Sequence, residues 1–207
     1  VMIVVFSIIW LLISFLMKYE YKRILIKNLL SSPKENFESL VERYRSFDRY
    51  FKREILTVFL KHRNDEIKEL SLKFIENTDK EDISEEIIDI CLSFKNLALK
   101  ARALGVLIRR GFLRTVINEI DGIFTRLDSS GRKDILIGIL EIDFKEKEEM
   151  LRKWLDLELS KENFLVISGM LLKISYQKSL NLITEVLRKK LVDNLAKKRF
   201  SIYIILE

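Results

Sequence analysis

The sequence predicts an all-α protein, in which one transmembrane helix precedes a right-handed α-solenoid of helix–turn–helix repeats. Its 207 residues include one proline and six glycines, too few chain breakers for the many tight turns of a sheet protein. Apolar residues recur at helical spacing in segments that repeat about every 32 residues, which is typical of stacked helix pairs. The first 17 residues carry no charge.

Residues 1–17 form the predicted membrane anchor, and Ser7 and Ser14 are their only polar members. A helix of this length is about 25 Å long at 1.5 Å per residue, close to the lower limit for crossing a bilayer. A cleaved signal peptide needs basic residues before the apolar run, and a core helix needs a polar face; this segment has neither. The residues predicted to contact lipid include Val1, Phe6, Trp10, Phe15 and Met17.

Residues 18–32 are the predicted basic juxtamembrane segment. They continue the helical spacing, either as an extension of the anchor helix or as a helix lying at the membrane surface. By the positive-inside rule, their basic residues place the rest of the chain in the cytoplasm. These basic residues are Lys18, Lys22, Arg23 and Lys27. Ser32, Pro33 and Glu35 then make a helix start signal, because they fit an N-cap, a first-turn proline and a capping box.

The third predicted region, residues 33–207, repeats itself. With Lys68 as origin, equivalent positions fall at intervals of 32 or 33 residues, at Lys100, Lys133, Leu165 and Lys197. Residues three, six and seven positions after each origin are small or apolar and share one face of a helix. They are Ser71, Phe74, Ile75, Ala103, Val106, Leu107, Leu136, Ile139, Leu140, Ser168, Leu171, Leu172, Phe200, Tyr203 and Ile204. Gly105, Gly138 and Gly169 fall nearby and are expected to let neighbouring helices approach closely.

A second set of amphipathic segments alternates with the first and completes the helix pairs. Its members cover residues 84–94, 114–124, 148–159 and 180–191, and an earlier, less regular pair covers residues 34–62. The apolar residues one repeat apart in this set are Ile88, Ile120, Trp154 and Val186. The only cysteine, Cys91, lies in an apolar run, so we expect a small core residue rather than a reactive thiol.

The repeats resemble the HEAT-repeat family, specifically its short bacterial-type members. The residues that carry the resemblance are Asp65, Ile67, Lys68 and Leu72 in one copy, and Leu99, Lys100, Ala103, Leu104 and Gly105 in the next. Two copies depart from the aliphatic–basic pair, at 132–133 and 164–165. The resemblance covers residues 33–207 and implies an α-solenoid whose second helices line a concave, protein-binding surface. Armadillo-like and tetratricopeptide-like repeats are alternatives, although the Trp, Gly, Tyr and Pro positions of the latter are absent.

Basic residues recur in register on the predicted second helices, and the chain has a formal net charge of +6. They form a candidate binding face for an acidic protein or a nucleic acid. The favoured interpretation is instead that each of them pairs locally with an acid in the adjacent turn, forming a structural ladder. The residues concerned are Lys68, Lys100, Arg102, Lys133, Lys197 and Arg199.

The sequence offers no catalytic constellation, and we expect neither an enzyme nor a metal or other cofactor. The only histidine, His62, is expected at a helix end, where a protonated ring would cap carbonyl groups. One histidine and one cysteine cannot build a Cys/His metal cluster. No glycine-rich loop of the kind that cradles phosphate occurs.

The function predicted from these features is that of a non-catalytic, membrane-anchored scaffold whose cytoplasmic repeats bind a partner protein. The apolar C-terminal strip suits a partner or self-association; its residues are Ile202, Ile204, Ile205 and Leu206. The alternative is a nucleic-acid-binding domain like the HEAT-like DNA glycosylases, for which Trp154 and Asp156 are the only hint. A third possibility is that the first segment packs within a larger complex without meeting lipid.

Overall fold

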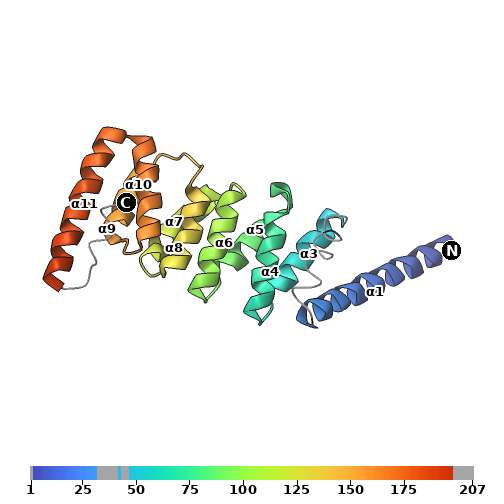
Figure 1. Cartoon of the computed structure of the whole chain (residues 1–207). Helices are drawn as coiled ribbons and strands as arrows, with labels where there is room; N and C mark the ends of the chain where they lie inside the picture. Colours follow the sequence, from blue (N-terminus) through green and yellow to red (C-terminus); the bar gives the residue numbers. More distant parts are fainter. Residues whose placement is uncertain (1, 32–41, 43–46, 198–207) are drawn as a thin grey trace. The chain divides into compact units, whose positions relative to one another are not determined.

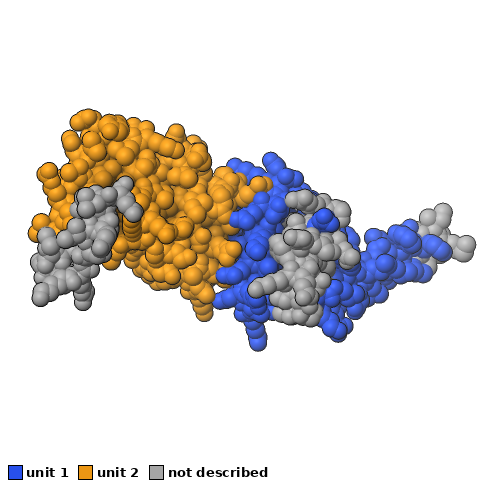
Figure 2. Space-filling model, viewed as in Figure 1, with its two compact units in different colours: residues 1–93 blue, residues 94–207 orange. Residues whose placement is uncertain are grey.

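The computed structural model describes residues 2–31, 42 and 47–197, and all regular structure in this part of the chain is helical (Figure 1). The prediction of an all-α protein is therefore confirmed. The chain divides into two compact units, Val1–Ser93 and Phe94–Glu207, which Figure 2 distinguishes by colour. The repeat domain expected over residues 33–207 stays a prediction from the sequence. Each unit is described by itself below.

The first unit contains one long helix and a group of shorter ones. They are α1 (Met2–Ser31), α3 (Arg49–Leu60), α4 (Asp65–Glu76), the 3-10 turn η1 (Lys80–Asp82) and α5 (Glu85–Leu92). The second unit contains six helices in its described residues. They are α6 (Leu97–Arg109), α7 (Leu113–Phe124), α8 (Ser129–Ile139), α9 (Lys147–Leu157), α10 (Lys161–Ile174) and α11 (Tyr176–Lys197).

Local sequence signals explain where five of these helices begin. Short polar side chains before the first turn accept hydrogen bonds from backbone N–H groups that have no partner inside the helix. These N-cap residues are Asn64, Ser84, Asn96, Asp128 and Ser160. After α6 the chain turns at Gly111, whose φ of 85° is accessible to glycine at no steric cost.

The repeat register read from the sequence is confirmed in α4, α6, α8 and α10. The positions three and six residues after each origin are buried in all four helices. They are Ser71, Phe74, Ala103, Val106, Leu136, Ile139, Ser168 and Leu171. One position further on, Ile75 and Leu107 are also buried, whereas Leu140 and Leu172 are half-buried. The prediction of which face of the second helices packs in the core is therefore correct.

The first helices of the pairs contribute the matching core positions. Ile88, Ile120, Trp154 and Val186 are all buried, as their one-repeat spacing predicts. Cys91 is fully buried as well, and this burial raises the pKa of its thiol to about 12. The thiol is therefore protonated at neutral pH and packs as a small apolar group.

The glycines of the second helices behave in two different ways. A Cβ atom on Gly105 would lie 2.6 Å from the carbonyl oxygen of Asp134, and one on Gly138 would lie 3.1 Å from that of Gly105. These two glycines thus allow α6 and α8 to approach closely, as predicted. The same expectation is wrong for Gly169, where an added Cβ atom would meet no atom of another helix within 4 Å. Gly169 comes one residue earlier in the repeat, so it points about 100° away from the contact.

The predicted fifth copy of the repeat differs from the structure. Lys197 was expected in a second helix that follows a turn, but α11 runs unbroken from Tyr176 to Lys197. This segment contains no glycine or proline that would end the helix. Arg199 and the apolar strip at residues 202–206 lie outside the described residues, as does most of the helix expected at residues 35–47. The second helix of that predicted pair, expected at residues 49–62, is confirmed as α3.

Candidate functional site

The strongest candidate for a functional element is α1. The predicted anchor and juxtamembrane segment form a single helix, so the boundary at residue 17 is not a structural break. Between Phe6 and Met17, all ten apolar side chains are 45–76% exposed. Among the predicted anchor residues, Phe6, Trp10, Phe15 and Met17 are thus exposed, and Val1 lies outside the described residues. Across the part of the chain that the structure describes, no helix is both long enough and apolar enough to span a membrane.

The apolar stretch of α1 ends where the helix touches the residues that lead into α3. The Nζ atom of Lys18 lies 3.8 Å from the Oδ2 atom of Asp48. The rings of Tyr21 and Phe47 meet edge to face, with 5.6 Å between their centroids. Two contacts of different chemistry therefore hold this point of α1 against the start of α3. Further along α1, Arg23 pairs with Glu20 at 3.7 Å, and Lys22 and Lys27 lie in the same helix.

Basic residues on α3 bind the turn η1. The Nε atom of Arg49 lies 2.8 Å from the Oδ1 atom of Asp82, and Arg49 also donates to the carbonyl oxygen of Glu81. Arg53 donates to the carbonyl oxygens of Asp82 and Glu81 at 3.1 and 2.7 Å. Lys52 adds a longer ion pair with Asp82, at 3.9 Å. These three basic side chains therefore hold α3 and η1 together.

The lysines that recur in the repeat register are also paired. Lys68 binds Asp65 at 2.6 Å within α4. Lys100 binds Glu119 on α7 at 2.7 Å, and its side chain is only 14% exposed. Lys133 on α8 binds Glu162 on α10 at 3.0 Å. The Lys68 pair is local, as the favoured interpretation expects, whereas Lys100 and Lys133 bind acids on other helices. Arg102 lies half-buried on α6, Lys197 ends α11, and Arg199 is outside the described residues.

A second set of ion pairs connects the first helices of the second unit. Lys153 on α9 binds Asp121 on α7 at 2.9 Å. Lys189 on α11 binds Asp156 on α9 at 3.2 Å. These pairs were not predicted from the sequence, although their signal is the repeat spacing itself. In each pair the acid and the base are 32 or 33 residues apart, so they occupy neighbouring copies.

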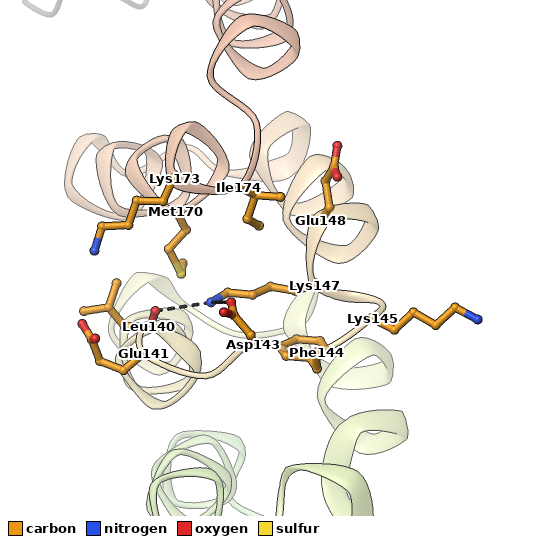
Figure 3. A pocket seen from close by; sticks show the side chains of 10 residues that line it. All are labelled: Leu140, Glu141, Asp143, Phe144, Lys145, Lys147, Glu148, Met170, Lys173 and Ile174. Atoms are coloured by element: carbon orange, nitrogen blue, oxygen red, sulfur yellow. Dashed lines mark hydrogen bonds and ion pairs between the residues drawn. The ribbon is translucent and has the colours of Figure 1, made fainter.

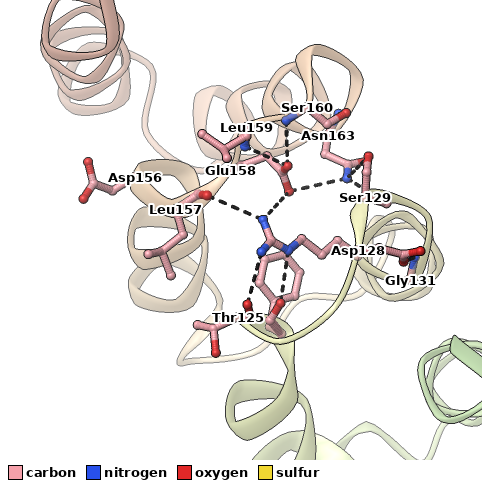
Figure 4. Close-up of polar contacts among 12 residues, drawn as sticks. Thr125, Asp128, Ser129, Gly131, Asp156, Leu157, Glu158, Leu159, Ser160 and Asn163 are labelled. Atoms are coloured by element: carbon pink, nitrogen blue, oxygen red, sulfur yellow. Dashed lines mark hydrogen bonds and ion pairs between the residues drawn. The ribbon is translucent and has the colours of Figure 1, made fainter. Parts of the chain in front are cut away.

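The second unit also contains a buried polar cluster at the turns α7–α8 and α9–α10 (Figure 4). The Nη1 atom of Arg132 lies 3.5 Å from the Oε2 atom of Glu158, whose side chain is 1% exposed. The Arg132 guanidinium also donates to the carbonyl oxygens of Phe124, Thr125 and Leu157. Its carbon lies 5.4 Å from the centre of the Phe124 ring, in cation–π geometry.

The rest of the cluster satisfies the carboxylate of Glu158. The backbone N–H groups of Leu159 and Ser160 donate to its Oε1 atom at 2.9 and 2.8 Å. The amide of Asn163 donates to its Oε2 atom at 3.4 Å and to the carbonyl oxygen of Ser129 at 2.8 Å. Because every buried charge has partners, the cluster is a structural clamp between two successive turns.

A cleft of about 700 Å³ opens at the ends of α8 and α10, beside the start of α9 (Figure 3). Its lining combines the apolar side chains of Leu140, Phe144, Met170 and Ile174 with charged groups of both signs. The most buried of these charges, Lys147, donates to the carbonyl oxygens of Leu140 and Ile142 at 3.3 and 2.7 Å. Lys147 therefore caps the end of α8 from the neighbouring helix.

The residues considered for other chemistry have structural surroundings. His62 follows the end of α3, as expected, and its Nδ1 atom accepts a hydrogen bond from the N–H of Asn64 at 3.1 Å. Trp154 is fully buried and stacks on Phe124 with 3.8 Å between the ring centres, so it offers no face to a nucleobase. In the described residues, no group of three or more His, Cys, Asp and Glu side chains is arranged to hold a metal ion.

Comparison of the chain with protein-family models, with curated proteins and with solved structures finds no match. The resemblance to HEAT repeats thus stays a prediction from the sequence.

Proposed function

We propose that this chain is a non-catalytic, membrane-anchored adaptor. In this proposal α1 inserts into a membrane, and the remaining helices form a right-handed, HEAT-like α-solenoid in the cytoplasm that binds a partner protein. The single observation that carries it is the exposure of ten apolar side chains on α1 between Phe6 and Met17. The basic residues after Met17 support the cytoplasmic orientation.

The energetics of α1 support an apolar surrounding. Full burial of one large apolar side chain is worth about 1.5–3 kcal/mol, so ten of them left in water on one helix carry a large unfavourable free energy. A helix that is apolar around its whole circumference is expected in lipid or inside a protein core. The described part of the first unit does not cover these side chains, and the sequence extends the apolar run back to Val1.

Exposed apolar residues support a protein as the partner of the helix pairs. In the second unit, Ile137, Leu159 and Leu165 are 46%, 76% and 57% exposed. Apolar side chains surrounded by polar groups are typical of protein–protein contact surfaces. The alternative of nucleic-acid binding has less support, because Lys100 and Lys133, which a phosphate backbone would need, are held by carboxylates.

The test of the anchor uses two leucines with the same exposed fraction, 57%: Leu12 on α1 and Leu165 on α10. An arginine at the centre of a membrane-inserted helix costs about 2.5–3.5 kcal/mol. We expect the unaltered chain and Leu165→Arg to stay with membranes after an alkaline carbonate wash, and Leu12→Arg to move to the soluble fraction. A washed, unaltered chain found in the soluble fraction would contradict the anchor.

The test of the partner uses Leu165→Arg, the control variant of the anchor test. After chemical cross-linking in cells and purification in detergent, we expect a second protein to co-purify with the unaltered chain. Leu165→Arg should reduce its recovery, because the substitution places a charge on the exposed apolar surface. A chain that purifies alone as a monomer, with no cross-linked product, would count against the adaptor role.

A further inference from the structure

We propose that the start of α3 is a second membrane contact, in which the ring of Tyr50 lies among the phospholipid headgroups. The inference rests on the proposed insertion of α1 and adds a lipid-facing site outside that helix. Its ligand is the headgroup and glycerol layer of a phospholipid bilayer.

The first step is the position of α3 relative to the apolar stretch. The stretch ends at Met17, and the next residue, Lys18, lies 3.8 Å from Asp48 through its charged group. One turn further along α1, Tyr21 contacts Phe47. If the apolar stretch is in lipid, these contacts place residues 47 and 48 at the level where hydrocarbon gives way to headgroups.

The second step is the exposure of Tyr50. It follows Asp48 by two residues, and it is 88% exposed, more than any other large apolar side chain in the described residues. Its neighbours Arg49 and Arg53 are held by η1 on one face of α3. A residue next to Arg49 lies about 100° around the helix, so Tyr50 does not share that face.

The third step is the chemistry of tyrosine. Its ring is apolar and its hydroxyl is polar, and such residues are enriched at the boundary between hydrocarbon and water. Tyr19, beside Lys18 on α1, is 59% exposed at the same level. Tyr19 and Tyr50 thus supply two interfacial rings from two different helices. Two contacts would fix the angle of α3 against the membrane, which a single anchor would leave free.

The experiment measures depth with nitroxide labels on introduced cysteines. Only these cysteines should react, because Cys91 is fully buried and its pKa is raised to about 12. The full-length chain is reconstituted into vesicles of phosphatidylcholine and phosphatidylglycerol, with the label at Trp10→Cys, Tyr50→Cys or Tyr176→Cys. Tyr176 is the matched control, a tyrosine that is 65% exposed on α11. Power saturation of the nitroxide signal with oxygen and with a water-soluble nickel chelate gives the depth of each label.

We expect the label at position 10 to lie in the hydrocarbon, the label at position 50 within a few ångströms of the phosphates, and the label at position 176 in water. A label at position 50 as water-exposed as that at position 176, with position 10 deep, would overturn this inference and leave the anchor intact. A water-exposed label at position 10 would overturn the anchor itself, and this inference with it.

A second measurement keeps an aromatic ring at the site. In a Trp10→Phe background, Trp154 is fully buried and its emission should not respond to vesicles. We expect Tyr50→Trp in this background to show a blue shift of emission when vesicles are added, and Tyr176→Trp to show none. Equal responses of the two variants would contradict a specific contact at the start of α3.

Discussion

Arg132 and Glu158 meet in the interior of the second unit, with 3.5 Å between the Nη1 and Oε2 atoms and only 1% of the Glu158 side chain exposed. Removal of one member leaves the other charge buried without its partner, which costs about 3–5 kcal/mol. We therefore expect Glu158→Ala to lower the free energy of unfolding by that amount in urea titrations. Glu158→Gln keeps an oxygen acceptor for the N–H groups of residues 159 and 160, so its loss should be smaller. Equal midpoints for Glu158→Ala and the unaltered chain would contradict the clamp.

Substitution of two glycines by alanine should change the stability of the chain in opposite directions. A Cβ on Gly105 would lie 2.6 Å from a backbone oxygen of Asp134, so Gly105→Ala should force α6 and α8 apart and destabilise the chain by about 1–3 kcal/mol. A Cβ atom on Gly169 would meet no atom of another helix within 4 Å, and Gly169 lies inside α10, where alanine is favoured over glycine by about 1 kcal/mol. Gly169→Ala should therefore raise the thermal midpoint while Gly105→Ala lowers it. Shifts in the same direction would contradict the packing described for α6 and α8.

Lys147 and Lys145 line the same cleft but should respond differently to substitution by methionine. Lys147 is 6% exposed, and its Nζ atom binds two carbonyl oxygens at the end of α8. Lys147→Met keeps most of the side-chain volume but leaves these buried acceptors without a donor, at a cost of about 1–3 kcal/mol. Lys145 is exposed, so Lys145→Met should change the free energy of unfolding by less than about 0.5 kcal/mol. Chemical denaturation of both variants measures this, and equal losses would argue against the capping role.

Cys91 should make stability depend on alkaline pH. Its thiol has an ordinary pKa of 9.0, and burial raises the pKa to about 12 in the folded chain. Below pH 9 the thiol is protonated in both states; above pH 9 only the unfolded chain loses the proton, so folding becomes less favourable. At pH 10, one unit above the pKa of the thiol in the unfolded chain, the free energy of unfolding should be lower by about 1.4 kcal/mol.

The control for this prediction is Cys91→Ala, because lysines and tyrosines also titrate in this range. The difference in unfolding free energy between the unaltered chain and the variant should shrink between pH 8 and pH 10. A difference independent of pH would show that the thiol ionises as easily in the folded chain as in the unfolded one.

The helical class and the packing register could be read from the sequence because both depend on apolar spacing within single segments. Phe74, Val106, Ile139 and Leu171 are buried one repeat after another, since each occupies the same position on its helix. The exposure of Gly169 could not be read in this way. A shift of one residue rotates a side chain by about 100°, and approximate alignment of copies does not resolve such a shift.

The polar contacts were less predictable than the core. Ion pairing of Lys100 and Lys133 was expected with acids in the adjacent turn, but their partners, Glu119 and Glu162, lie on other helices. Glu158 was not singled out, because a glutamate in a turn usually lies in water. Its burial results from N–H groups and a guanidinium that converge from two turns, and this is a tertiary property.

The ion pairs between the first helices bear on how the repeats arose. The helix α9 carries both Lys153, which binds the copy before it, and Asp156, which binds the copy after it. A tandem duplication of the α9–α10 segment would therefore add a copy that has both a lysine to pair with the copy before it and an aspartate to pair with the copy after it. Loss of the α9–α10 segment would leave Lys189 of α11 to pair with Asp121 of α7 in place of Lys153. The charges of the second unit are thus arranged so that one copy can be added or removed without leaving these ion pairs incomplete.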